Sequence, residues 1–258
     1  MSIENIVTYL TNVPQSTLSD TRDSKTYVVR KLADGNCWML KNLDLDLSTS
    51  VTLDSNTSDL TAGRTWTPQN NIQTTTGVAW AEDGGNTARS MDPGNIYFPD
   101  GAGVGAADAN ANLAGVTSGE PWEFIGNYYN WYAATAGTGT AAMISGNATD
   151  SICPKGWKLP DNTGTKSFFN LITTTYGLGD SNTASLTKFL QAPLNFVRDG
   201  FYNWSRSQIF RKGAHGYWWS TAAASVTNAY YLSTDTVNVY PQTNSSKGNG
   251  LTIRCVAR

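Results

Sequence analysis

Side chains able to carry out catalysis are scarce in this sequence. His215 is the single histidine, so sites in which several histidines bind zinc are excluded, and a Ser-His-Asp triad would depend on this one residue. It lies just before an expected strand, where a position in a solvated loop is favoured. Asp44 and Asp46 alternate with leucines, which indicates the solvated face of a strand rather than a cleft or a calcium site. Because motifs for phosphate binding, serine hydrolases and zinc proteases are also missing, we expect no catalytic residues, no metal and no cofactor.

Three cysteines, Cys37, Cys153 and Cys255, are too few and too widely spaced for a zinc ribbon. Two interpretations remain open: one disulfide with one buried thiol, or three reduced and buried thiols. Among the possible disulfides we favour Cys153–Cys255. Closing a loop of about 100 residues would stabilise the domain by on the order of 4 kcal/mol in the chain-entropy model.

The composition indicates a folded, strand-rich extracellular protein. Only 15% of the residues are charged, whereas Ser, Thr and Asn make up 78 of the 258 residues and aromatic residues reach 11%. A net charge of −2 without a dense Lys/Arg cluster argues against nucleic-acid binding. No apolar stretch is long enough to span a bilayer, and residues 1–10 lack the pattern of a signal peptide. From the composition we expect a secreted or cell-surface protein, although no signal or anchor is visible in this sequence. We also expect it neither to bind nucleic acid nor to insert into a membrane.

The elements that would position a site begin after an expected lead-in of residues 1–24. Strands are predicted at 25–32 and 37–47, the second with alternate leucines buried. A long irregular insertion is expected at about 48–120, and loops of this length tend to be functional or family-specific. Helices are predicted at 167–177, capped by Ser167 or Thr165 and ended by Gly177, and at 185–191.

The C-terminal part of the chain predicts a β-meander. Its expected strands are 216–221, 227–234 and 236–240, followed by a loop at 241–250 and a closing strand at 251–258. Residues that alternate along the closing strand should share one face, and these are Leu251, Ile253, Cys255 and Ala257.

Five ordered motifs carry a resemblance to a known family. They are GNCWMLKNLDL (35–45), YYNWYAATAG (128–137), ICPKGWKLP (152–160), GYWWST (216–221) and GLTIRCVAR (250–258). The combination resembles the Fibrobacter succinogenes major paralogous domain, which is similar to the formylglycine-generating-enzyme variety of the C-type lectin fold. The resemblance implies an α+β domain over 25–258 with its N- and C-terminal strands together and a loop-rich region that presents ligand. It also supports the Cys153–Cys255 pairing, because both cysteines fall in matching motifs.

The segment 228–258 looks like the variable region of proteins diversified by a diversity-generating retroelement. Adenine-directed mutagenesis in such systems enriches Asn, Ser, Thr, Tyr and Asp at scattered positions, and these residue types suit adaptable recognition. The alternative is a plain polar hairpin in a protein rich in Ser, Thr and Asn. Aromatic anchors are expected at Trp218, Trp219, Tyr230 and Tyr231, with one of the two tryptophans in the core and the other exposed or covered by the insertion. The polar ligand-binding positions are predicted to be Ser233, Asp235, Thr236, Asn238, Tyr240, Thr243, Asn244, Ser245, Ser246 and Asn249.

Departures from the related families limit what the resemblance implies. The oxidase activity of formylglycine-generating enzymes needs a close pair of reactive cysteines, whereas only Cys255 follows Cys153 here. Neither 120–122 (EPW) nor 240–242 (YPQ) supplies the oxygen ligands of calcium-dependent sugar binding. We therefore expect a non-catalytic binding protein, with the segment 217–249 recognising a protein or glycan without a cofactor. The alternatives are an enzyme that uses carboxylates of the 48–120 region and a structural surface module for adhesion.

Overall fold

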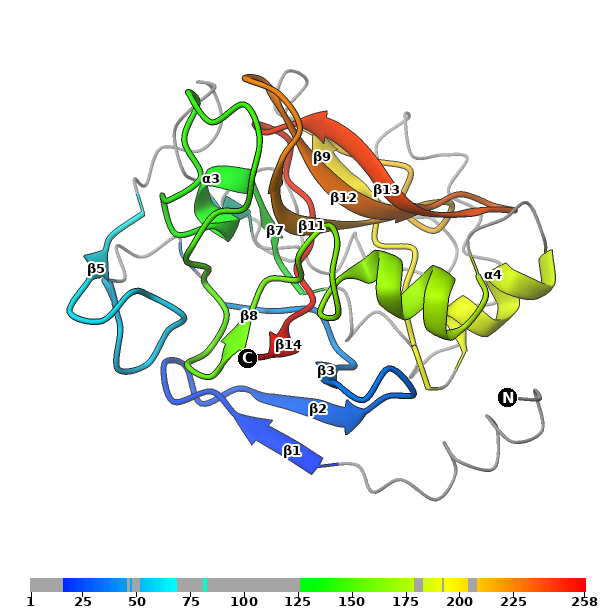
Figure 1. Cartoon of the computed structure of the whole chain (residues 1–258), viewed down its shortest axis with the longest axis horizontal. Coiled ribbons are helices and arrows are strands. Elements are labelled where there is room, and N and C mark those ends of the chain that lie inside the picture. Colours follow the sequence, from blue (N-terminus) through cyan, green and yellow to red (C-terminus); the bar gives the residue numbers. More distant parts are fainter. Residues whose placement is uncertain are drawn as a thin grey trace.

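The computed structural model describes residues 16–45, 47, 52–68, 81–82, 126–178, 183–191, 193–203 and 208–258. The first fifteen residues of the expected lead-in and most of the expected insertion, including every residue of 83–120, lie outside these ranges. Within them the protein is α+β, with several small antiparallel sheets and few helices (Figure 1).

Strands from both ends of the chain form one five-stranded sheet (Figure 1). Its order is β1 (Ser16–Ser19), β2 (Thr26–Lys31), β3 (Cys37–Met39), β14 (Val256–Ala257) and β8 (Trp157–Lys158). The predicted strand at 25–32 is confirmed by β2. The predicted strand at 37–47 forms a ladder only over β3, although Leu43, Leu45 and Leu47 are buried as expected. Because β1 pairs with β2, residues 16–19 of the expected lead-in are part of this sheet.

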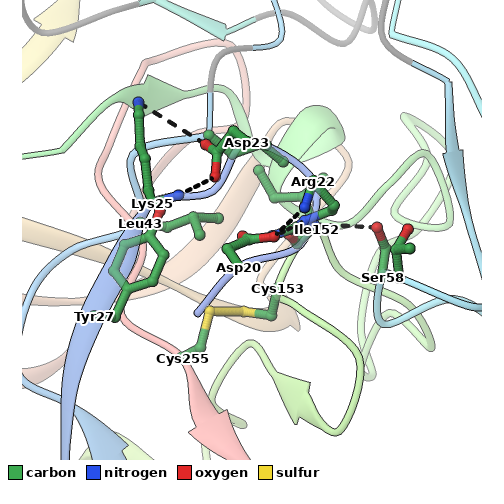
Figure 2. Close-up of polar contacts among 12 residues, drawn as sticks. Asp20, Arg22, Asp23, Lys25, Tyr27, Leu43, Ser58, Ile152, Cys153 and Cys255 are labelled. Carbon is green, nitrogen blue, oxygen red and sulfur yellow. Dashed lines mark hydrogen bonds and ion pairs between the residues drawn. A yellow bond between two sulfur atoms is a disulfide. The ribbon is translucent and has the colours of Figure 1, made fainter. Parts of the chain in front are cut away.

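The turn between β1 and β2 ties this sheet to the segment that carries Cys153 (Figure 2). The buried Arg22 guanidinium donates hydrogen bonds to the Asp20 carboxylate (2.8 Å), the Ile152 carbonyl (2.7 Å) and the Ser58 hydroxyl (3.1 Å). Beside this turn Cys153 and Cys255 form a disulfide across 102 residues, the pairing that the sequence favours. The third cysteine, Cys37, is exposed, so the expectation of a buried thiol is wrong.

A three-stranded antiparallel sheet lies at the opposite end of the molecule from β1 and β2 (Figure 1). It contains β11 (Gly216–Ala223), β12 (Asn228–Thr234) and β13 (Val239–Ser246), in this order, so β13 is an edge strand. Two predicted strands are confirmed by β11 and β12. The third is misplaced, because Asp235 accepts hydrogen bonds from the backbone N–H groups of Val237 and Asn238 and makes 235–238 a turn. The expected loop at 241–250 is therefore strand up to Ser246.

Both predicted helical segments are present, but the first differs from the expected α-helix in its hydrogen bonding. The predicted 167–177 segment is helical, yet most of it is the π-helix η3 (Asn170–Thr175), where the Tyr176 N–H donates to the carbonyl of Leu171 five residues back. Its expected cap is present, since the Ser167 hydroxyl accepts from the Asn170 N–H at 3.0 Å. The second predicted helix is α4 (Thr183–Leu190), and a one-turn helix, α3 (Trp131–Ala134), follows β7 (Tyr128–Tyr129).

Short strand pairs complete the described structure. They are β4 (Leu53–Asp54) with β5 (Thr65–Trp66), β6 (Ala81–Glu82) with β7, and β9 (Phe201–Asn203) with β10 (Gln208–Phe210). Three of these strands fall inside the predicted irregular insertion, whose described parts are thus anchored by strand pairing.

Two apolar clusters fill the interior on opposite sides of β11. Trp219 packs in the cluster that contains Met39, Trp131 and the disulfide, whereas Trp218 packs in the cluster that contains Phe189 and Leu232. Successive strand residues point to opposite faces, so neighbouring tryptophans enter different clusters. Both faces of the closing segment are buried as well, because Val256 joins the second cluster and Arg254 is 1% exposed.

Candidate functional site

The polar positions predicted to bind ligand gather along one edge of the three-stranded sheet. We define the β13 edge as residues 235–246, that is, the turn after β12 and the strand β13. Three predicted positions, Thr236, Tyr240 and Asn244, are exposed there. Asp235, Asn238, Thr243, Ser245 and Ser246 are half-buried. The β13 edge therefore places most of the predicted polar side chains within reach of a ligand.

The register of the sheet shows which side chains of the neighbouring strands lie beside this edge. Trp219, Tyr231 and Thr243 lie directly opposite one another on β11, β12 and β13 and so share one face. Burial decreases along this row, from the fully buried Trp219 to the half-buried Tyr231 and Thr243. The Tyr231 ring packs edge-on against Trp219, with ring centroids 6.0 Å apart. The side chain at position 243 thus lies in one row of the sheet with two aromatic side chains that contact each other.

The turn at the start of the β13 edge is held by a closed set of hydrogen bonds. The Asp235 carboxylate accepts from the N–H groups of Val237 and Asn238, both at 2.7 Å, from the Asn238 side-chain amide at 3.0 Å and from the Tyr240 hydroxyl at 2.9 Å. Partial burial alone would raise the pKa of Asp235, but these four hydrogen bonds outweigh it and lower the pKa to about 2. Asp235 is therefore a charged turn-forming residue whose oxygens are already engaged.

Three predicted contact residues are buried. Trp218 and Trp219 are fully buried, so neither is an exposed anchor, and the prediction that both contact ligand is wrong. Their indole N–H groups donate inward, to the Asn42 side chain (3.1 Å) and the Tyr129 carbonyl (2.8 Å). Ser233 is 5% exposed and its hydroxyl lies 3.2 Å from that of Thr243. In the sheet, Ser233 pairs with Tyr217 of β11 on one side and with Tyr240 of β13 on the other.

The far end of β13 is fixed by polar contacts and a buried lysine. Asn249 donates from its side chain to the Ser245 hydroxyl at 3.0 Å, and Asn228 donates to the exposed Asn244 amide oxygen at 2.9 Å. The Lys247 ammonium donates to three backbone carbonyls, at 2.7, 3.1 and 3.1 Å, and lies 4.8 Å from the centre of the Trp131 ring. Both ends of the β13 edge are thus anchored, one by Asp235 and one by Lys247.

Sequence reasoning named Tyr231 as an anchor but missed the residues that pack with it beside the β13 edge. Tyr217, 7% exposed, packs against the rings of Phe201 (5.1 Å), Tyr231 (5.7 Å) and His215 (6.0 Å). Burial lowers the pKa of His215, and the nearby Arg211 lowers it further. The sequence signal available for this group was the aromatic density of 201–219, but its aromatic members Phe201, Tyr217 and Tyr231 come from three separate strands.

Other kinds of site receive little support from the described residues. Among them, no three His, Cys, Asp or Glu side chains are grouped so as to hold a metal ion. The helices of the described ranges include none of the length and apolarity needed to cross a membrane. Comparison of the chain with family models, with curated proteins and with solved structures finds no match.

Proposed function

We propose that the protein is a non-catalytic ligand-binding protein of the C-type lectin type, with the β13 edge as its recognition surface. The observation that carries this proposal is the distribution of burial. Exposed or half-buried uncharged polar residues line the edge strand, while the strands beneath them are fixed by two apolar clusters and a disulfide. Tyr, Ser, Thr and Asn on a rigid support combine contact area with adaptable hydrogen bonding.

The proposal includes diversification of this edge by a retroelement. A surface can vary without loss of the fold when its side chains contribute little to the core. Thr236, Tyr240 and Asn244 meet this condition, since all three are exposed. Trp218, Trp219 and Ser233 do not meet it and belong to the constant scaffold in this account.

A location outside the cytosol and a macromolecular partner are part of the same proposal. The disulfide supports an oxidising compartment, because such bonds are rare in reducing ones. An edge strand of eight residues offers an elongated surface suited to a protein or glycan.

Selection from a library tests the proposal. Codons for Thr236, Tyr240, Thr243, Asn244, Ser245 and Ser246 are randomised in the full chain, and the library is selected separately on two unrelated purified proteins. We expect folded variants that differ in partner preference. A matched control library varies Thr17, Thr26 and Lys31, exposed positions of β1 and β2 at the opposite end of the molecule from the β13 edge. Equal yields of specific binders from both libraries, or none from the β13 library, would contradict the proposal.

A further inference from the structure

The aromatic group beside the β13 edge forms a continuous, partly exposed surface. Phe201 of β9 contacts Phe210 of β10 at 5.9 Å between ring centroids and Tyr217 of β11 at 5.1 Å. Tyr217 in turn contacts Tyr231 of β12. Phe201, Phe210 and Tyr231 are all half-buried, so each residue keeps part of its surface exposed. We call these four residues the aromatic cluster.

Backbone geometry brings the β9–β10 hairpin against β11. Gly200 has a positive φ of 71°, and a Cβ at this position would meet the Phe210 carbonyl oxygen at 2.5 Å, so only glycine allows the close approach. The Gly200 N–H also donates to the His215 carbonyl at 2.8 Å. The cluster is thus positioned by backbone contacts and is present before any ligand binds.

Arg211 stands at the rim of this cluster in an unusual conformation. Its φ of 60° is left-handed, a region costly for a non-glycine residue, and the N–H groups of Ala214 and His215 hold its carbonyl at 3.0 and 2.9 Å. The side chain is exposed, and one guanidinium nitrogen lies 3.3 Å from the Tyr217 hydroxyl. The strained backbone therefore directs a cation to the edge of an apolar surface.

The charges around the cluster are unbalanced toward positive. Arg198 is half-buried, and its Nε atom is buried without a hydrogen-bond partner among the described residues. Arg198 and His215 both interact electrostatically with the Asp235 carboxylate. That carboxylate already accepts four hydrogen bonds within its own turn. A carboxylate from outside the chain can instead pair with the exposed guanidinium of Arg211, beside the Tyr217 hydroxyl.

From this arrangement we infer that the aromatic cluster, with Arg211 at its rim, binds a segment of a protein partner in which Asp or Glu stands next to an apolar side chain. This inference rests on the proposed function and adds the chemistry of the partner. Aromatic residues and Arg are the types enriched where protein interfaces have their strongest contacts. The Phe201 and Tyr217 rings meet edge to face, so together they do not form a single flat platform of the kind on which a sugar stacks. Binding here should weaken with salt, because an exposed charge pair is screened.

Selection with displayed peptides tests the inference. The full chain is the bait for short random peptides on phage, at low and at high ionic strength. We expect enrichment of peptides that pair Asp or Glu with an apolar residue, and loss of that enrichment at high salt. Arg211→Gln should weaken binding of the selected peptides by about tenfold or more, because a hydrogen-bonded charge is removed. Lys188→Gln removes an equally exposed cation from α4 and should leave binding unchanged.

Several results would overturn the inference. These are enrichment of no peptide, enrichment of peptides without acidic residues, or equal binding by wild type and Arg211→Gln when circular dichroism shows both to be folded. Binding of immobilised polygalacturonate that is lost in Arg211→Gln, without peptide enrichment, would overturn the protein partner in favour of an acidic glycan. If the β13 library changes partner preference while acidic peptides are not enriched, only this inference fails. If acidic peptides bind while β13 variation changes nothing, the recognition role of the β13 edge fails.

Discussion

The Tyr240 hydroxyl donates a 2.9 Å hydrogen bond to the carboxylate of Asp235, five residues earlier in the chain. This bond joins the first exposed side chain of β13 to the turn that starts the strand, and Asn238 donates to both residues. Removing it should loosen the turn without disturbing the core, since Tyr240 is 39% exposed.

Tyr240→Phe tests this link. The variant deletes one of the four hydrogen bonds that hold the pKa of Asp235 at about 2, so that pKa should rise toward its usual value. We expect a small loss of unfolding free energy at neutral pH, because the bond lies at the surface. Because the pKa of Asp235 is lower in the folded than in the unfolded protein, its ionisation stabilises the fold at pH values above the unfolded pKa of about 3.9. This contribution is lost as the pH falls from there toward 2. Carboxyl NMR titration measures the shift, and Tyr230→Phe is the control that should leave it unchanged.

The disulfide should provide a large share of the stability. The bridge spans 102 residues, and removing it by Cys153→Ala with Cys255→Ala should cost on the order of 4 kcal/mol of unfolding free energy in the chain-entropy model. Cys37→Ser should have little effect, because Cys37 is exposed and unbridged. Alkylation of the unfolded, unreduced chain followed by mass measurement should label one thiol; three labelled thiols would show that no bridge exists.

Lys247 should be essential for the far end of the β13 edge. Lys247→Met leaves three backbone carbonyls without their donor, and we expect a loss of about 2–4 kcal/mol of unfolding free energy. Lys188→Met, an exposed lysine of α4, is the matched control and should change stability by about 0.5 kcal/mol or less. Urea denaturation compares the two, and equal effects would show that the Lys247 contacts do not stabilise the fold.

Asp199 should make stability depend on pH. Burial raises the pKa of this carboxyl to about 8, and hydrogen bonds from Thr252 and the Tyr217 N–H lower it only in part. The Thr252 hydroxyl oxygen lies 2.5 Å from the carboxyl oxygen and 2.9 Å from the Tyr217 carbonyl, so its single proton cannot serve both. A protonated Asp199 resolves this, because it donates to Thr252 while Thr252 donates to Tyr217.

The sign of the dependence follows from the raised pKa. Asp199 stabilises the fold fully below its unfolded pKa of about 3.9, and this contribution is lost as pH rises toward 8. Asp199→Asn does not titrate, so the difference in unfolding free energy between variant and wild type should change steadily from about pH 5 to pH 8. His215, whose pKa is lowered, has the opposite effect on stability, but it titrates in both proteins and therefore cancels in the difference. Arg254, with a pKa near 9, stays charged over this range. A constant difference across the range would contradict the assignment.

Local patterns predicted β11, β12 and both longer helical segments, because aromatic and apolar residues recur there at strand or helix spacing. They missed the length of β13, since Thr243, Asn244 and Ser245 show no apolar alternation and pair only because β12 lies beside them. Burial of both Trp218 and Trp219 depends on two clusters built from distant segments. The contact of Phe201 with Tyr217 likewise arises only when the β9–β10 hairpin docks on β11.

A segment exchange tests the central claim most directly. Two library variants selected on different purified proteins exchange residues 235–246, and the affinity of each hybrid for both proteins is measured. If the β13 edge is the recognition surface on a constant scaffold, partner preference moves with the exchanged segment while thermal stability stays nearly the same. Preference that stays with the rest of the chain, in hybrids that fold, would contradict the account.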